Sequence, residues 1–235
     1  MVISRDRALL VRNLLDDWLP PVVRDSRWVM GPLLRLALGP GWRTFADFKP
    51  RGFVLDSEEF GAVYAGLGSS AEIQGETDLN PACVDAILGS ARGRVLDVGC
   101  GRGYLAERLA GVSEDVTGCD IVLYDGMSAR DGLTFVEGSV EALPFDDGEF
   151  DTVVCTHTLE HVQRLDRALA ELRRVARELV IVVVPRERPY RYSFNLHLHF
   201  FPYPWSWAAV AGVVPGATLT DLGDWLYLEP AGRTG

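Results

Sequence analysis

"VLDVGCGRGY", residues 95–104, reads as a short apolar strand that runs directly into a glycine-rich turn. Glycines at 99, 101 and 103 let the backbone approach a ligand closely, and the helix predicted after the turn offers N–H groups there. The dinucleotide fingerprint requires glycines at relative positions one, three and six, and the sixth position here is tyrosine. Asp97, two residues before the first glycine, would repel a pyrophosphate but suits a cationic ligand. The turn therefore predicts a nucleotide-like cofactor with a positive charge.

A second acid supports this interpretation. Asp120 lies at the end of "VTGCDI", residues 116–121, about 20 residues after the glycine turn. An acid at the tip of the second strand is the usual partner of ribose hydroxyls. A lone glycine-rich turn is often only a tight loop, but a glycine turn followed by this acid favours a nucleotide site.

The surrounding sequence alternates between strand-like and helix-like segments. Strands alternating with helices predict a parallel sheet built from right-handed βαβ units. Near the C-terminus, two strand-like runs follow each other almost directly, which predicts an antiparallel hairpin at the edge of that sheet. The predicted parallel strands are 93–100, 115–121, 133–138, 150–156 and 178–185, and the hairpin runs are 217–223 and 224–230.

These segments resemble the successive motifs of class I S-adenosylmethionine-dependent methyltransferases over roughly residues 76–187. The resemblance implies a Rossmann-like, doubly wound, mostly parallel seven-stranded sheet with a C-terminal antiparallel hairpin and a helical N-terminal cap. It also implies S-adenosylmethionine as cofactor and S-adenosylhomocysteine as product. The motifs are "VLDVGCGRGYLAERLA", "VTGCDI", "FVEGSVEALPFDDGEFDTVVCTHTLEHV" and "RRVARELVIVVVP".

By the same resemblance, individual residues acquire cofactor-binding roles. Asp97, Gly99 and Gly101 would face the methionine moiety, and Asp120 would bind both ribose hydroxyls. Where the family often has an acid that accepts a hydrogen bond from the adenine amino group, this chain has a serine, a weaker acceptor. Glu141, two residues further on, is a candidate substitute. The remaining implied cofactor residues are Ile121, which would pack on the adenine ring, Ser139 and Val140 at its other edge, and Thr156.

The four histidines of the chain fall in two short stretches, "THTLEHV" (156–162) and "NLHLHFF" (195–201). Each stretch follows a predicted strand, so both are expected at the sheet edge where α/β folds bind ligands. In one interpretation, His157, His161 and His199 surround the methyl acceptor and one of them acts as general base.

Two other interpretations of the histidines stay open. His157, Glu160 and His161 are spaced to share a helix face and, with His197 or His199, to bind a divalent metal ion. The resemblance here is to small-RNA 2′-O-methyltransferases and some ubiquinone-pathway O-methyltransferases, although His157 replaces the first acid of their motif. In the last interpretation the stretch is structural. A metal is not the favoured interpretation.

Composition and the spread of aromatic residues indicate the organisation of the chain. The chain has 235 residues, of which 48% are hydrophobic and 24% charged, and a formal net charge of −10, which argues against a nucleic-acid partner. All six tryptophans lie outside the central α/β interval. We therefore expect a helical, aromatic-rich cap or lid over 1–75 and a cofactor-binding domain over 76–235, with a substrate-lid insertion at 191–215.

The sequence also gives expectations about location and partners. It shows neither a signal-peptide pattern nor an apolar run of the roughly 20 residues that a membrane span needs, so we expect a cytoplasmic protein. The stretch "GPLLRLALGPGW", residues 31–42, is compatible with peripheral contact to a membrane surface, since Arg27, Arg35 and Arg43 accompany it. The sequence is also compatible with a homodimer.

These observations predict methyl transfer from S-adenosylmethionine to an oxygen, nitrogen or carbon of a small, partly apolar metabolite. The aromatic-rich flanks favour a ring-bearing, sugar or lipid-linked acceptor. A catalytically silent domain that keeps the cofactor fold for binding or assembly is the alternative, and the intact glycine turn with both acids speaks against it.

Overall fold

The computed structural model describes residues 19–68, 77–124, 126–192 and 195–232. The chain divides into two compact units: Met1–Gly75 with Arg188–His199, and Glu76–Glu187 with Phe200–Gly235. The segment 188–199, at the start of the predicted lid, thus groups with the helical N-terminal unit, whereas 200–215 groups with the sheet. Separate roles for these regions stay a prediction.

The first unit is helical in its described N-terminal part. Its elements are α2 (Pro21–Arg24), α3 (Arg27–Leu38), the 3-10 turn η1 (Gly39–Gly41), α4 (Trp42–Gly52) and α5 (Ser57–Gly68). Proline often ends a helix, but α3 runs through Pro32 and ends before Gly39, which has a φ of 59°. A proline removes one N–H donor from a helix but does not by itself force an end.

Buried side chains fasten the segment 188–199 to these helices. Tyr192 packs in one apolar cluster with Met30, Leu34 and Ala46. The guanidinium of Arg24, buried beneath this cluster, donates a hydrogen bond to the Tyr192 carbonyl. A buried guanidinium needs a hydrogen-bond acceptor, so this bond fixes the segment 188–199 against the helices.

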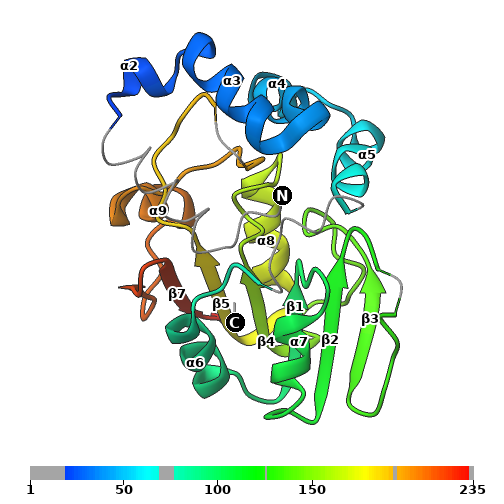
Figure 1. Cartoon of the computed structure of the whole chain (residues 1–235). Coiled ribbons are helices and arrows are strands. Elements are labelled where there is room, and N and C mark those ends of the chain that lie inside the picture. The colour runs from blue at the N-terminus through cyan, green and yellow to red at the C-terminus, as the bar shows by residue number, and fades with distance from the viewer. Residues whose placement is uncertain (1–18, 69–76, 125, 193–194, 233–235) are drawn as a thin grey trace. The chain divides into compact units, whose positions relative to one another are not determined.

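The second unit is a seven-stranded sheet with the order β3-β2-β1-β4-β5-β7-β6. Strands β1 to β5 pair in parallel, and β7 pairs antiparallel with both β5 and β6. Figure 1 shows this sheet with the hairpin at one edge. The predicted fold, including the hairpin, is confirmed. The strands are β1 (Arg94–Val98), β2 (Asp115–Asp120), β3 (Leu133–Glu137), β4 (Phe150–Thr156), β5 (Ala176–Val184), β6 (Thr218–Asp221) and β7 (Trp225–Pro230).

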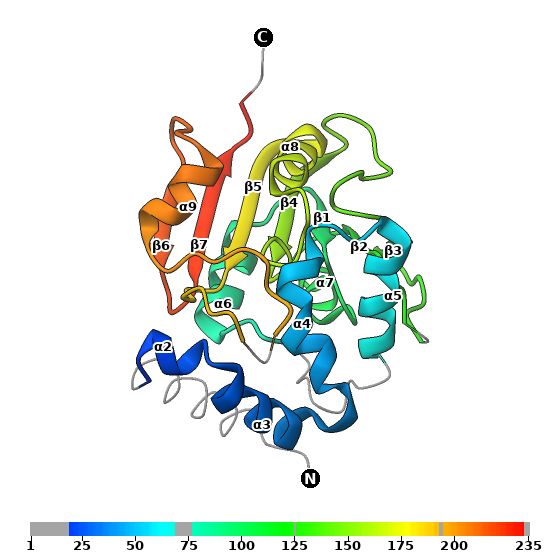
Figure 2. The ribbon, with the colours of Figure 1, turned by 90° about the horizontal axis from the view of Figure 1, so that it is seen from above.

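Helices cover both faces of the sheet. The helices α6 (Pro81–Ser90) and α7 (Tyr104–Leu109) share one apolar cluster with side chains of β1, β2 and β5. The helices α8 (Leu165–Val175) and α9 (Pro204–Ala211) share the cluster on the opposite face (Figure 2). Strands buried on both faces explain the continuous apolar runs seen in the sequence. No helix within the described ranges is long and apolar enough to cross a membrane.

Candidate functional site: the carboxyl ends of the parallel strands

The glycine turn joins β1 to α7 and is held by the tip of β2. The N–H groups of Gly99 and Cys100 donate to the Cys119 carbonyl at 2.7 and 3.2 Å. The N–H of Gly101 donates to a carboxylate oxygen of Asp120 at 2.8 Å. Gly99 and Gly101 have φ values of 73° and 54°, where a side chain would be strained. The turn is therefore fixed against the acid that the sequence assigns to the ribose.

Asp97 lies beneath this turn at the end of β1. Its side chain is 1% exposed, and neither carboxylate oxygen has a hydrogen-bond partner within the described ranges. Burial and the negative charge of Asp120 raise the pKa of Asp97 to about 7, although the backbone N–H of Ala106, which lies near the carboxylate without forming a hydrogen bond of normal geometry, offsets part of the rise. A buried carboxylate of this kind is a ready partner for a ligand cation.

Asp120 lies at the tip of β2 with both oxygens engaged by the backbone. Besides the bond from Gly101, the N–H of Val122 donates to the other oxygen at 3.2 Å. Burial raises the pKa of Asp120, and the surrounding backbone N–H groups lower it in part. A carboxylate oxygen accepts more than one hydrogen bond, so both oxygens can still receive hydroxyl donors. The next residue, Ile121, is 37% exposed, as a platform for a flat ring would be.

The loop after β3 carries the residues predicted to surround the adenine. Val140 is buried, and the hydroxyl oxygen of Ser139 accepts the N–H of Glu141 at 3.2 Å. The carboxylate of Glu141 accepts the N–H groups of Gln163 and Arg164 at 2.8 and 2.9 Å. Glu141 therefore ties this loop to the segment before α8 and is not placed as the substitute acid for adenine.

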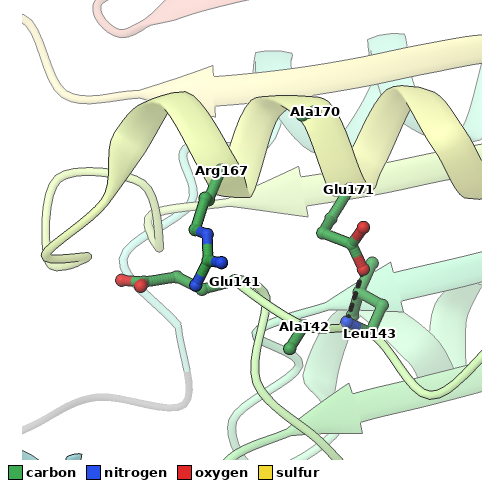
Figure 3. Close-up of a pocket in the computed structure, with 6 residues that line it drawn as sticks. All are labelled: Glu141, Ala142, Leu143, Arg167, Ala170 and Glu171. Atoms are coloured by element: carbon green, nitrogen blue, oxygen red, sulfur yellow. Dashed lines mark hydrogen bonds between the residues drawn. The ribbon is translucent and has the colours of Figure 1, made fainter.

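Figure 3 shows the surface pocket beside this loop, with a volume of about 370 Å³. The carboxylate of Glu171 accepts the N–H of Leu143 at 2.7 Å and pairs with Arg174, also at 2.7 Å. Both acids of this pocket, Glu141 and Glu171, already accept backbone N–H groups. The pocket therefore lies where the loop after β3 packs against α8. It contains neither Asp97 nor Asp120.

His157 follows β4 and is held between two carboxylates. It is the one non-glycine residue of the described ranges with a positive φ, 48°. Its Nδ1 lies 3.3 Å from Glu160, and its Nε2 lies 3.7 Å from Asp224 in the β6–β7 turn. Burial lowers the pKa of His157, but the nearby carboxylates of Asp224 and Glu160 outweigh this effect and raise the pKa to about 10.

The same network reaches the start of α6. The side-chain amide of Asn80 donates to Asp224 at 2.9 Å, and its oxygen accepts the N–H of Cys83 at 2.9 Å, which makes Asn80 the N-cap of α6. His157 thus connects β4, the hairpin and α6. The sequence offered no signal for the part that Asp224 plays, because an acid in a hairpin turn is ordinary.

The other predicted site residues divide between the two units. His161 is half-buried in the turn after β4, and its N–H donates to the Thr158 carbonyl at 3.0 Å. Thr158, whose hydroxyl donates to the carbonyl of buried Thr156 at 2.9 Å, lies against Gly99. The turn after β4 therefore packs on the glycine turn. His199 belongs to the helical unit, where its ring meets Phe53 edge-on with centroids 5.5 Å apart.

The two glycines of the turn give a paired test. A methyl group on Gly99 would lie 2.7–2.8 Å from Thr158 carbons, whereas one on Gly101 would meet no atom within 4 Å. Both substitutions incur the backbone strain of positive φ, roughly 1–2 kcal/mol. We expect Gly99→Ala to lower the free energy of unfolding by about 1–3 kcal/mol more than Gly101→Ala, because only Gly99→Ala overpacks. Gly101→Ala should instead lose cofactor affinity, since its methyl group enters the open space above the turn.

Denaturant unfolding and calorimetric titration of the two variants separate these effects. Equal destabilisation by both would contradict the close packing on Thr158. Unchanged affinity in Gly101→Ala would contradict a ligand over the turn.

Comparison with known proteins agrees with this geometry. Residues 96–184 match a family model described as a methyltransferase domain. The chain is 36% identical over 99 residues to a demethylmenaquinone methyltransferase of Beutenbergia cavernae, an alignment that covers 41% of each chain. It is 43% identical over 90 residues to a malonyl-[acyl-carrier protein] O-methyltransferase of Geobacter sulfurreducens, covering 35% of this chain and 34% of the relative. The chain thus spans well under two thirds of these relatives.

A solved structure extends the similarity to most of the fold. The magnesium protoporphyrin IX methyltransferase of Synechocystis PCC 6803 with bound S-adenosylmethionine superimposes with a TM-score of 0.51 at 18% identity. The match covers 76% of this chain and 99% of that one. At this identity the likeness concerns the fold alone. Together with the domain matched over residues 96–184, it makes the chain similar in sequence and in fold to S-adenosylmethionine-dependent methyltransferases.

Proposed function

We propose that this protein transfers a methyl group from S-adenosylmethionine to an oxygen, nitrogen or carbon of a small, partly apolar metabolite. The observation that carries the proposal is the buried carboxylate of Asp97, which has no hydrogen-bond partner in the described ranges and lies beneath the glycine turn. A solitary buried carboxylate is unfavourable unless a cation or donor reaches it. The ammonium of a methionine moiety is such a group.

Other residues near the glycine turn fit the same cofactor. Asp120 presents both oxygens at the strand tip for a vicinal diol, and partly exposed Ile121 stands beside it for the adenine. The space above Gly101 is open to the ligand. When bound, S-adenosylmethionine supplies an activated methyl group on its sulfonium. The roles of Ser139, Val140 and Thr156 along the cofactor are part of the proposal.

The acceptor class rests on composition and on the names of relatives. Two similar proteins are named demethylmenaquinone methyltransferase and malonyl-[acyl-carrier protein] O-methyltransferase. In "RPYRYSFNLHLHFFPYPWSW", Tyr203 and Trp205 are exposed aromatic side chains that would suit a ring or an apolar chain. We therefore propose an aromatic, sugar or lipid-linked acceptor.

We assign different roles to the histidines after β4. Both ring nitrogens of His157 face carboxylates, so His157 is a positioning residue that fixes the strand end and the hairpin. His161 stands on the turn that packs against the glycine loop, and we propose it as the proton acceptor. An acceptor-side role for His199 stays a prediction.

A turnover assay tests the proposed function. The protein is incubated with S-adenosylmethionine and a panel of quinols, phenols, sugars and acyl carboxylates, and S-adenosylhomocysteine is measured by mass spectrometry. At least one acceptor should give product in proportion to enzyme. Binding of the cofactor without turnover on any acceptor would favour the silent binding module.

Variants of β2 test the cofactor assignment. Asp120→Ala should weaken S-adenosylmethionine by about 2–3 kcal/mol, the scale of charge-assisted hydrogen bonds. Asp115→Ala, at the opposite end of the same strand, removes an exposed ion pair to Arg94 and should leave affinity unchanged. Unchanged calorimetric affinity in Asp120→Ala, or tight NAD binding by the wild type, would refute the assignment.

A further inference from the structure

Helix α3 carries apolar side chains on two sides. Met30 and Leu34 are fully buried in the cluster with Ala46 and Tyr192. On the other side of the helix, Trp28 is 91% exposed and Leu36 is 86% exposed. The exposed apolar residues fall within one arc of about 140° at 100° per residue. We call this set the α3 face: Trp28, Val29, Pro32, Leu33 and Leu36.

Such a face needs an explanation. Single exposed apolar residues are normal, but a contiguous exposed apolar set usually marks an interaction site. Trp28 and Leu36 lie eight residues apart, about 12 Å along the helix axis. Tryptophan is also the side chain that best suits a boundary between apolar and polar phases.

The charge around the α3 face differs from that of the chain. Residues 21–52 hold six basic residues and two acidic ones, whereas the whole chain has a net charge of −10. Asp47, one of the two acids, pairs with Arg27 at 3.4 Å. Arg35 and Arg43 are exposed, and neither forms an ion pair within the described part of the chain. On α3 itself, Arg35 lies within about 20° of Trp28 at 100° per residue, so the apolar arc has a cation at its edge in an otherwise acidic protein.

We propose that the α3 face docks on an anionic phospholipid surface. Trp28, Leu33 and Leu36 would enter the boundary between headgroups and acyl chains, and Arg35 and Arg43 would bind lipid phosphates. An apolar helix face with basic flanks and a tryptophan is the composition that lies in a bilayer interface. Arginine also covers apolar surface with its stem while its charge stays in the headgroup layer.

A second copy of the chain fits this face less well. Symmetric pairing of two α3 faces would bring the arginines of one copy towards those of the other, because an isologous contact opposes like patches. A membrane of anionic lipid has the opposite charge and no such conflict. Charge complementarity thus selects the lipid surface as the occupant.

Co-sedimentation with lipid vesicles tests this proposal on the full chain without cofactor. We expect binding to phosphatidylcholine vesicles to tighten by about tenfold or more when phosphatidylglycerol is included, because each arginine near the surface contributes roughly 1 kcal/mol. Added salt should weaken the binding. The double variant Trp28→Ser/Leu36→Ser should lose it, and Arg35→Gln/Arg43→Gln should fall to the level of neutral vesicles.

A matched control separates this face from general stickiness. Val213 belongs to the sheet unit and is 98% exposed, so Val213→Ser removes an equally exposed apolar side chain and should bind vesicles like the wild type. Equal melting temperatures of the variants will show that folding is intact. As an independent measurement, brominated lipid should quench the fluorescence of the wild type more than that of Trp28→Phe.

Several results would overturn the proposal. These are absence of vesicle binding, indifference to phosphatidylglycerol, or full binding by the Trp28→Ser/Leu36→Ser variant. A dimer in light scattering that this variant dissociates, without vesicle binding by the wild type, would assign the face to a second copy instead. Because vesicle binding requires no methyl transfer, its failure leaves the proposed function untouched.

Discussion

His161→Ala is expected to lower kcat by about 10²–10⁴-fold, the usual contribution of a positioned general base. The affinity for S-adenosylmethionine should barely change, because we place this imidazole on the acceptor side of the glycine turn. The wild-type rate should fall at acidic pH, since an imidazolium has no lone pair to receive a proton. Steady-state kinetics across pH, with calorimetry for the cofactor, measures both effects.

His157→Ala is the comparison variant. Because His157 bridges Glu160 and Asp224, its removal leaves the buried carboxylate of Glu160 and the partly buried carboxylate of Asp224 without their shared cation. We therefore expect a fall in the free energy of unfolding as well as any loss of rate. His157→Lys, which restores a positive charge, should recover part of the stability. Near wild-type rates in the alanine variants of His157, His161, His197 and His199 would make the clustering architectural.

Chelation distinguishes a base from a metal ion at the same histidines. If a divalent ion acts there, exhaustive EDTA treatment should abolish turnover, and zinc, manganese or magnesium should restore it. Full activity after EDTA leaves the base and the structural interpretations. The proposal of His161 as base requires that result.

Asp97→Asn is expected to stabilise the cofactor-free protein while weakening S-adenosylmethionine. An aspartate ionises near pH 3.8 in the unfolded chain, but burial raises the pKa of Asp97 to about 7 in the folded chain. Between these values the folded chain holds the extra proton, so the free energy of unfolding of the wild type should fall as pH rises from about 4 to 7. Above pH 7 it should be level.

The asparagine variant lacks this dependence. At about pH 8 it should exceed the wild type by up to roughly 4 kcal/mol, the linkage value of about three pKa units. Its affinity for S-adenosylmethionine should fall by about 2 kcal/mol or more, because the ammonium loses a charged partner. Denaturant unfolding at several pH values and calorimetry measure the two quantities.

Asp151→Asn gives a control of opposite sign. Asp151 lies in β4, and a backbone hydrogen bond from Arg94 together with the Arg177 guanidinium lowers the pKa of its carboxyl group. Its replacement should destabilise at neutral pH, and the difference from the wild type should vanish at low pH, where Asp151 is protonated. If Asp97→Asn followed the wild type at each pH, Asp97 would not be a buried charge.

The sequence alone was sufficient to predict the strands of the sheet unit and the position of the glycine turn. Parallel strands are predicted by apolar runs that end in glycine or an acid and are separated by segments of helical periodicity. Both patterns are local in the chain and can therefore be recognised in the sequence. The hairpin from 217 to 230 was equally readable, since its turn is only a few residues long. The cofactor roles of Asp97 and Asp120 stay predictions, which follow from their places in the motifs that resemble the methyltransferase family.

The tertiary structure decided which side chains meet across the sheet. His157 lies between Glu160 and Asp224. Asp224 follows His157 by 67 positions in the chain, and no local sequence pattern predicts such a pairing. Glu141, a candidate substitute for the family's adenine-binding acid, accepts the N–H groups of Gln163 and Arg164 before α8. Both outcomes depend on where a loop finds backbone donors after the strands have packed, which a one-dimensional pattern does not contain.

The helical unit shows the same division. Its helices follow from composition, but the grouping of 188–199 with α3 and α4 depends on long-range contacts of buried Tyr192 and Arg24. The sequence marks α3 as apolar on most of its surface without saying which side is covered. Packing buries Met30 and Leu34 and leaves Trp28 and Leu36 exposed, because a single layer of neighbours can cover only one side of a helix.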